Sequence, residues 1–215
     1  MNYRVLTYML LTGLLMVSGC TGVKYQESAE QLPVSETKMI YRDAIETWTQ
    51  EGRIYDGLLT KLISKITFKS AVFRQAYAEE YARLYKLEGP EYDKLVLDEQ
   101  KEAADYNDFV IAAYVPEKKW DDFSKNTSMW KIYITRDQVE QIRPLEIRKL
   151  KKKDPIIDYF YPYMTAWKSI YHVRFPAFDP KTDNQPMGDA YDTVTLVMTS
   201  VIGSVEFKWE TNQQQ

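Results

Sequence analysis

Phe109-Val110-Ile111-Ala112-Ala113-Tyr114-Val115 (FVIAAYV) is a continuous apolar run that follows Asn107-Asp108 and ends before Pro116. Short apolar runs bounded by residues that favour turns are typical of strands buried on both faces. We therefore expect Phe109–Val115 to be the central strand of a sheet, and we place the other elements around it.

Five further segments downstream have the composition of strands and are bounded by Pro, Gly, Asn or Asp. Gly203 lies between the last two and predicts their hairpin turn. A short helix is expected near Asp154–Tyr161. Six short strands in about a hundred residues predict an antiparallel β-sandwich, with an immunoglobulin-like form as one candidate. The five segments are Met129–Thr135, Val139–Leu150, Ser169–Phe175, Thr193–Val201 and Ser204–Trp209.

The half of the chain before Phe109 is expected to be mainly helical. Glu36–Glu51 has apolar residues near helical spacing and predicts an amphipathic helix that ends by Gly52. Leu58–Phe68 fits both an alternating strand pattern and a helical period; we favour the strand and leave the helix open.

Two further helices are predicted between that segment and the central strand. Ser70 has the character of an N-cap, and the apolar stripe that follows it stops at Gly89-Pro90. A second helix is expected over Glu91–Asp105. Together they form a helical insertion that covers an edge or face of the sheet, which makes the fold class α+β.

The N-terminus has the three parts of a secretory signal. Met1–Arg4 carries one positive charge, Val5–Val17 is mostly apolar, and Ser18-Gly19 are small. The apolar part is too short for a permanent membrane helix, which needs about 20 residues. We therefore expect residues 1–19 to be removed.

Val17-Ser18-Gly19-Cys20 resembles the lipobox of bacterial lipoproteins. The resemblance implies a mature chain that begins at Cys20 and carries a diacylglycerol on its sulfur. Two or more acyl chains give stable membrane attachment. In such lipoproteins an aspartate directly after the cysteine often signals retention in the inner membrane, and Thr21 stands at that position here. The resemblance therefore points to the periplasmic side of the outer membrane. If the source has one membrane, it points to the outside of the plasma membrane.

Composition narrows the function of the mature chain. Losing Arg4 with the signal leaves 27 basic and 31 acidic residues, a formal charge of −4, so bulk charge does not indicate a nucleic-acid partner. Cys20 is the only cysteine; once acylated, it leaves no thiol for a disulfide, zinc site or nucleophile.

We expect residues 20–35 to be a tether spanning roughly 20 Å and residues 36–210 to form one globular domain.

Two candidate sites for chemistry each have a structural alternative. His172 is the only histidine and lies in an expected strand, where a structural imidazole is favoured over a base. Asp121-Asp122 after Trp120 is compatible with a glycosidase carboxylate pair, but adjacent residues in an extended chain point apart and a turn explains them as well. We predict no catalytic residue, metal site or cofactor.

Two candidate surfaces are retained. The first is a basic cluster that would face anionic headgroups or be a solvated strand end. The second is an aromatic platform for a peptide or glycan, with core packing as its alternative. The cluster contains Arg148, Lys149, Lys151, Lys152 and Lys153, with Arg143 nearby, and the platform contains Tyr159, Tyr161, Tyr163 and Trp167.

These features predict a lipid-anchored envelope protein that binds or scaffolds an envelope protein or glycan partner and is not an enzyme. One alternative is a glycan-active enzyme built on the acidic and aromatic residues. The other is a lipid or glycolipid carrier, which requires a closed apolar cavity between sheet and helices.

Overall fold

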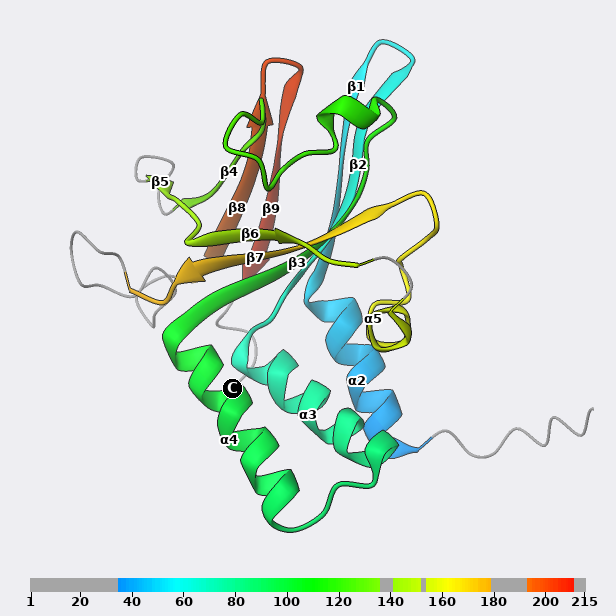
Figure 1. The fold of residues 1–215 in the computed structure, drawn as a ribbon, viewed down its shortest axis with the longest axis vertical. Coiled ribbons are helices and arrows are strands. Elements are labelled where there is room, and N and C mark those ends of the chain that lie inside the picture. The colour runs from blue at the N-terminus through cyan, green and yellow to red at the C-terminus, as the bar shows by residue number, and fades with distance from the viewer. Residues whose placement is uncertain (1–34, 136–140, 152–153, 179–192, 211–215) are drawn as a thin grey trace, which may run out of the picture. The chain divides into compact units, whose positions relative to one another are not determined.

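The chain divides into two units, Met1–Val34 and Ser35–Gln215. The computed structural model describes residues 35–135, 141–151, 154–178 and 193–210, all in the second unit (Figure 1). The predicted signal, the acylation site Cys20 and most of the predicted tether lie outside the described residues, as do Lys152 and Lys153.

The helices α2 (Glu36–Thr47) and α3 (Ala71–Tyr85) each begin where a serine side chain caps the first turn. In front of α2 the Ser35 hydroxyl accepts a hydrogen bond from the backbone of Lys38, and in front of α3 the Ser70 hydroxyl accepts one from Phe73. These bonds satisfy amide groups that a helix leaves free at its first turn. The other helices are α4 (Pro90–Asp105) and the short α5 (Pro155–Phe160).

One sheet contains the predicted central strand. Its order is β1-β2-β3-β7-β6, and all neighbours are antiparallel. The strand β3 lies in the middle and is buried along almost its whole length, as expected for FVIAAYV. The bounds are β1 (Thr49–Asp56), β2 (Leu59–Phe68), β3 (Tyr106–Tyr114), β6 (Glu146–Lys149) and β7 (Ser169–Pro176).

The second sheet has the order β5-β4-β8-β9 and is also antiparallel. The β8–β9 hairpin is confirmed, although its turn residues are Val201-Ile202 and Gly203 opens β9. A Cβ on Gly203 would lie 2.5 Å from Ile54 Cγ2, so the glycine allows β9 to approach β1. The bounds are β4 (Lys131–Thr135), β5 (Gln141–Ile142), β8 (Thr193–Ser200) and β9 (Gly203–Glu210).

A single hydrophobic core unites the two sheets and the helices. The ring centroids of Phe68 and Phe109, on the first sheet, lie 6.1 and 5.4 Å from that of Trp209 on the second. At the helical end, the Tyr41 ring packs edge-on against Phe160 at 5.1 Å. Figure 1 shows α2, α3 and α4 gathered at one end of the sheets, so the insertion covers an end of the sheet layer.

The α+β class is confirmed, and so is the strand interpretation of Leu58–Phe68. The predicted helix Glu36–Glu51 is too long, because Thr49 begins β1. The prediction missed β1, whose inner face carries the small Gly52 and therefore lacks an apolar alternation. The predicted strand Val139–Leu150 is wrong: Pro144, which has no amide N–H for a ladder, separates β5 from β6, and these join different sheets.

Candidate functional site

A groove of about 500 Å³ lies between β4 of one sheet and β6 of the other. The β5–β6 connection and the loop between β3 and β4 also line this groove. Its size falls within the usual range for ligand sites, roughly 300–1,000 Å³. The residues that line the groove are Phe123–Asn126, Trp130–Tyr133, Gln141 and Arg143–Ile147.

The floor of the groove is apolar and firmly packed. The rings of Phe123 and Trp130 meet edge to face at 5.5 Å, and Phe123 also packs against Tyr171 at 4.8 Å. Trp130 donates its indole N–H to the carbonyl oxygen of Trp120 at 2.9 Å. Since these rings are buried, they fix the shape of the groove.

The rim of the groove is cationic. Lys125, Lys131 and Arg143 are exposed there, and among the described residues none of them has an ion-pair partner. Glu146 is the one carboxylate among the lining residues, and Arg148 Nε lies 3.8 Å from it. An excess of positive charge above an apolar floor favours ligands that are both anionic and partly apolar.

Asp121 holds the loop that forms one wall. Its carboxylate accepts hydrogen bonds from the Ser169 hydroxyl at 2.5 Å and the Tyr171 hydroxyl at 2.8 Å, and it pairs with Lys149 Nζ at 2.9 Å. Burial would raise the pKa of Asp121, but these three hydrogen bonds outweigh it and hold the pKa below its usual range. Asp121 therefore anchors the loop to β6 and β7.

The neighbouring carboxylate also has a local partner. Asp122 Oδ1 accepts a hydrogen bond from Ser128 Oγ at 2.9 Å, within the same loop. Both members of the candidate glycosidase pair are thus engaged in shaping the groove wall. Neither is among the residues that line the groove.

Of the predicted basic cluster, the structure describes Arg148, Lys149 and Lys151. Lys149 pairs with Asp121, and its ammonium lies 5.2 Å from the centre of the Tyr171 ring. Arg148 and Lys151 are exposed, whereas Lys152 and Lys153 lie outside the described residues. Strand alternation turns Lys149 toward the inner face and Arg148 toward the outer face, so these two residues do not share a face of β6. The rim of the groove instead uses Arg143, which the sequence indicated, with Lys125 and Lys131, which it did not.

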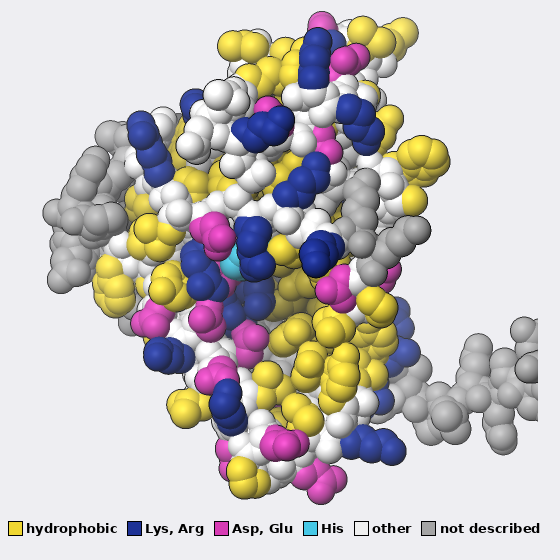
Figure 2. All heavy atoms as spheres, in the orientation of Figure 1, with side chains coloured by type: hydrophobic (Ala, Val, Ile, Leu, Met, Phe, Trp, Pro, Cys, Tyr) yellow, Lys and Arg dark blue, Asp and Glu magenta, His cyan; other side chains and the backbone are white. Residues whose placement is uncertain are grey.

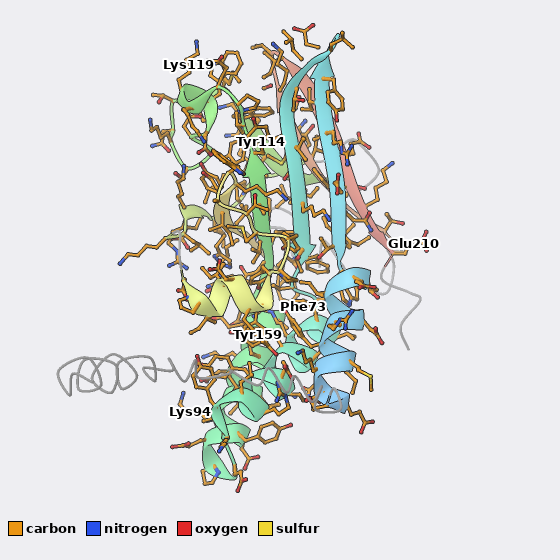
Figure 3. All side chains as sticks on the ribbon, turned by 90° about the vertical axis from the view of Figure 1, so that its right-hand side faces the viewer. Phe73, Lys94, Tyr114, Lys119, Tyr159 and Glu210 are labelled. Carbon is orange, nitrogen blue, oxygen red and sulfur yellow. The ribbon has the colours of Figure 1, made fainter. Side chains whose placement is uncertain are left out.

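The predicted aromatic platform is wrong as a single surface. Tyr161 is 7% exposed and belongs to the core, so burial raises its pKa. Tyr163 is hydrogen-bonded through its hydroxyl to Thr67 at 2.5 Å. Tyr159 on α5, which Figure 3 labels, donates its hydroxyl hydrogen to the carboxylate of Glu80 on α3. Trp167 is the most exposed of the four, at 74%, and Tyr159 is 38% exposed. Local spacing could not reveal that Phe160 on α5 packs inward against Tyr41 on α2 and Tyr77 on α3.

A separate charge cluster surrounds Asp108 at the start of β3. Arg74 donates to its carboxylate at 2.7 Å, and Arg174 donates twice at 2.8 Å. His172 Nε2 lies 3.3 Å from Oδ1. Figure 2 shows the histidine among Lys, Arg, Asp and Glu side chains. The structure thus places the single histidine mostly buried in β7, beside the carboxylate of Asp108.

This cluster joins the helical insertion to the sheet. Arg74 on α3 also donates to Glu99 on α4 at 2.6 Å, and Arg174 on β7 pairs with Glu102 on α4. Burial would raise the pKa of Asp108, but the hydrogen bonds and charges of His172, Arg174 and Arg74 hold it well below its usual range. Because its contacts are between the chain's own elements, we interpret the cluster as a structural clamp.

Within the described residues, no group of three or more His, Cys, Asp or Glu side chains is placed to hold a metal ion. None of the described helices combines the length and apolar character needed to cross a bilayer. Comparison of the chain with protein-family models, with curated proteins and with solved structures finds no match. The groove between the sheets therefore stands as the candidate functional site on its geometry alone.

Proposed function

We propose that this chain is a lipid-anchored envelope protein whose globular domain, residues 36–210, binds an anionic, partly apolar ligand in the groove without chemically changing it. The observation that carries this proposal is the cationic rim of Lys125, Lys131 and Arg143 above a packed apolar floor. The lipobox resemblance at Cys20 supports attachment to the periplasmic side of the outer membrane, with residues 1–19 as the signal and 20–35 as the tether.

We further propose that the two sheets are the layers of a β-sandwich related to the immunoglobulin arrangement. When strands are numbered in the order of the chain, the two sheets of a variable-type immunoglobulin domain have the strand orders 1-2-7-6 and 9-8-3-4-5. The two sheets of this chain have the strand orders 1-2-3-7-6 and 9-8-4-5. The two orders differ in the position of the third strand. Contacts of Phe68 and Phe109 with Trp209 support stacking of the two sheets.

A binding role is favoured over the two alternatives by where the polar groups lie. A glycan-active enzyme would need a pair of free carboxylates at its groove, whereas Glu146 is the one carboxylate that lines this groove and Asp121 and Asp122 are held by hydrogen bonds within the loop. A lipid carrier would need its cavity between sheet and helices, whereas this groove lies between strands of two sheets.

The anchor is tested by Cys20→Ser. Because the acyl chains attach to the sulfur, we expect the serine variant to lose fatty-acid labelling and to leave the membrane fraction or stay unprocessed. Metabolic labelling with a clickable fatty acid and envelope fractionation measure both effects, and Ser18→Ala, which keeps a small residue in the lipobox, is the control. Equal labelling and membrane recovery of Cys20→Ser and the native chain would contradict the anchor.

The groove is tested with 8-anilinonaphthalene-1-sulfonate, a small probe with an anionic group and apolar rings. We expect residues 35–215, which contain the whole core, to bind it, and Lys131→Glu with Arg143→Glu to weaken its affinity about tenfold, or about 1.4 kcal/mol. Fluorescence titration measures the affinity. Lys94→Glu with Lys208→Glu makes the same change in net charge at exposed positions away from the groove and should have little effect.

The two double variants separate a local from a general charge effect. Equal weakening by both would mean that the probe responds to net charge alone. Unchanged affinity in the Lys131 and Arg143 variant would place the probe elsewhere. Either result would contradict the groove as the binding site.

A further inference from the structure

One edge of β4 is only partly paired. On one side, all five residues of β4 pair with β8, from Lys131↔Thr199 to Thr135↔Thr195. On the other side, β5 pairs only at Ile134↔Ile142 and Thr135↔Gln141. Among the described residues, Lys131–Tyr133 therefore has no neighbouring strand on the side of β5.

The groove runs along this unpaired edge. Trp130–Tyr133 contributes four consecutive lining residues, and Gln141 and Arg143–Ile147 also line the groove. An unpaired edge of an antiparallel sheet presents amide N–H and carbonyl groups in regular alternation, which is a template for another extended chain. Three residues of a strand span roughly 10 Å, at about 3.3 Å per residue.

The side chains beside the edge also alternate in character. Ile132 faces the core, whereas Lys131 is exposed and Tyr133 is half-buried on the opposite face. Ile147 on β6 packs against the same core. A strand added beside β4 would therefore meet apolar side chains on its inner face and the cations Lys131 and Arg143 on its outer rim.

We propose that the groove binds an extended segment of a partner protein in which acidic and apolar residues alternate, and that this segment adds to the second sheet as a strand beside β4. This inference rests on the proposed function and names its ligand. An extended peptide fits better than a glycan or a lipid headgroup, because only a peptide offers backbone donors and acceptors at the spacing of the free edge. Charge complementarity with the rim selects carboxylates at every second position.

The test uses the full chain, purified in non-ionic detergent, and three fluorescein-labelled peptides. One alternates Asp and Val over eight residues, one has the same composition as a block of Asp followed by a block of Val, and one is the alternating peptide N-methylated at every second amide. N-methylation removes strand hydrogen bonds and keeps the charge. Fluorescence polarisation gives the three affinities.

We expect the alternating peptide to bind at least tenfold more tightly than either of the others. Lys131→Glu with Arg143→Glu should weaken its binding by tenfold or more, whereas Lys94→Glu with Lys208→Glu should leave it nearly unchanged. Equal affinity for all three peptides would show that the site responds to charge alone and would overturn strand addition.

Failure of this inference can be told apart from failure of the proposed function. If the alternating peptide does not bind while the anilinonaphthalene probe still depends on Lys131 and Arg143, the peptide ligand is wrong and the groove remains a site for another anionic ligand. Competition of the probe by anionic phospholipid vesicles, but not by the peptide, would assign the groove to a lipid headgroup instead. If neither probe nor peptide depends on the two cations, the groove is not the binding site.

Discussion

Replacing Asp108 with alanine is expected to lower the free energy of unfolding by about 3–5 kcal/mol, the usual cost of removing one partner from a buried ion pair. Asp108 is 1% exposed, and Arg74, which donates to it, is 2% exposed. Without the carboxylate, Arg74 keeps Glu99 but loses a second anion, and Arg174 loses two hydrogen bonds. Urea unfolding followed by circular dichroism measures the change.

The matched control is Asp98→Ala on the exposed side of α4. Asp98 pairs with Lys94 at 2.6 Å, a distance like those in the buried cluster, but both side chains are mostly exposed. Exposed pairs of this type contribute about 0.3–0.5 kcal/mol. A similar small loss for Asp108→Ala would mean that the cluster does not hold the helices on the sheet.

The depressed pKa of Asp108 determines how its contribution to the free energy of unfolding depends on pH. Its pKa in the folded chain is depressed, whereas in the unfolded chain it should be near 3.9. The unfolded state therefore binds the proton first on acidification, so the contribution of Asp108 is complete above about pH 5 and declines below about pH 4. The difference in stability between the native chain and Asp108→Asn should shrink over that acidic range. A difference that stays constant down to pH 3 would contradict the depressed pKa.

The features of the fold that follow from local pattern could be predicted from the sequence. FVIAAYV at 109–115 identified the centre of the first sheet because a strand buried on both faces needs no alternation. Ser70 located the start of α3 because a cap is a local interaction. The ambiguity over Leu58–Phe68 was resolved by pairing with β1 and β3, which is a tertiary effect.

The candidate site could not be predicted in the same way. Its rim joins Lys125 and Lys131 to Arg143 only because the β3–β4 loop, β4 and the β5–β6 connection meet at one groove. From the sequence alone, Asp108 has the character of a turn residue. Its role depends on Arg74 and Arg174, which come from elements distant in the chain. Pro144 is a local signal that the segment 139–150 is interrupted, because proline cannot donate a ladder hydrogen bond. The sequence therefore contained the information that separates β5 from β6.

Phe109→Ala is the second substitution with a large expected effect, a loss of about 3–5 kcal/mol. Phe109 is fully buried in β3. Its ring stacks on Phe68 at 5.0 Å, meets Phe175 edge-on at 5.6 Å, and lies 5.4 Å from Trp209. Three of these four rings belong to the first sheet and Trp209 to the second, so alanine would leave a cavity where the two sheets meet.

The control is Phe178→Ala, which removes the same ring at an exposed position and should change stability by less than about 0.5 kcal/mol. Phe109→Leu restores most of the lost volume, so it should recover most of the stability. Urea unfolding followed by circular dichroism measures the change in stability of all three variants. A loss below about 1 kcal/mol for Phe109→Ala would mean that the sheets do not share one core at β3, and the proposed sandwich would then lack its main support.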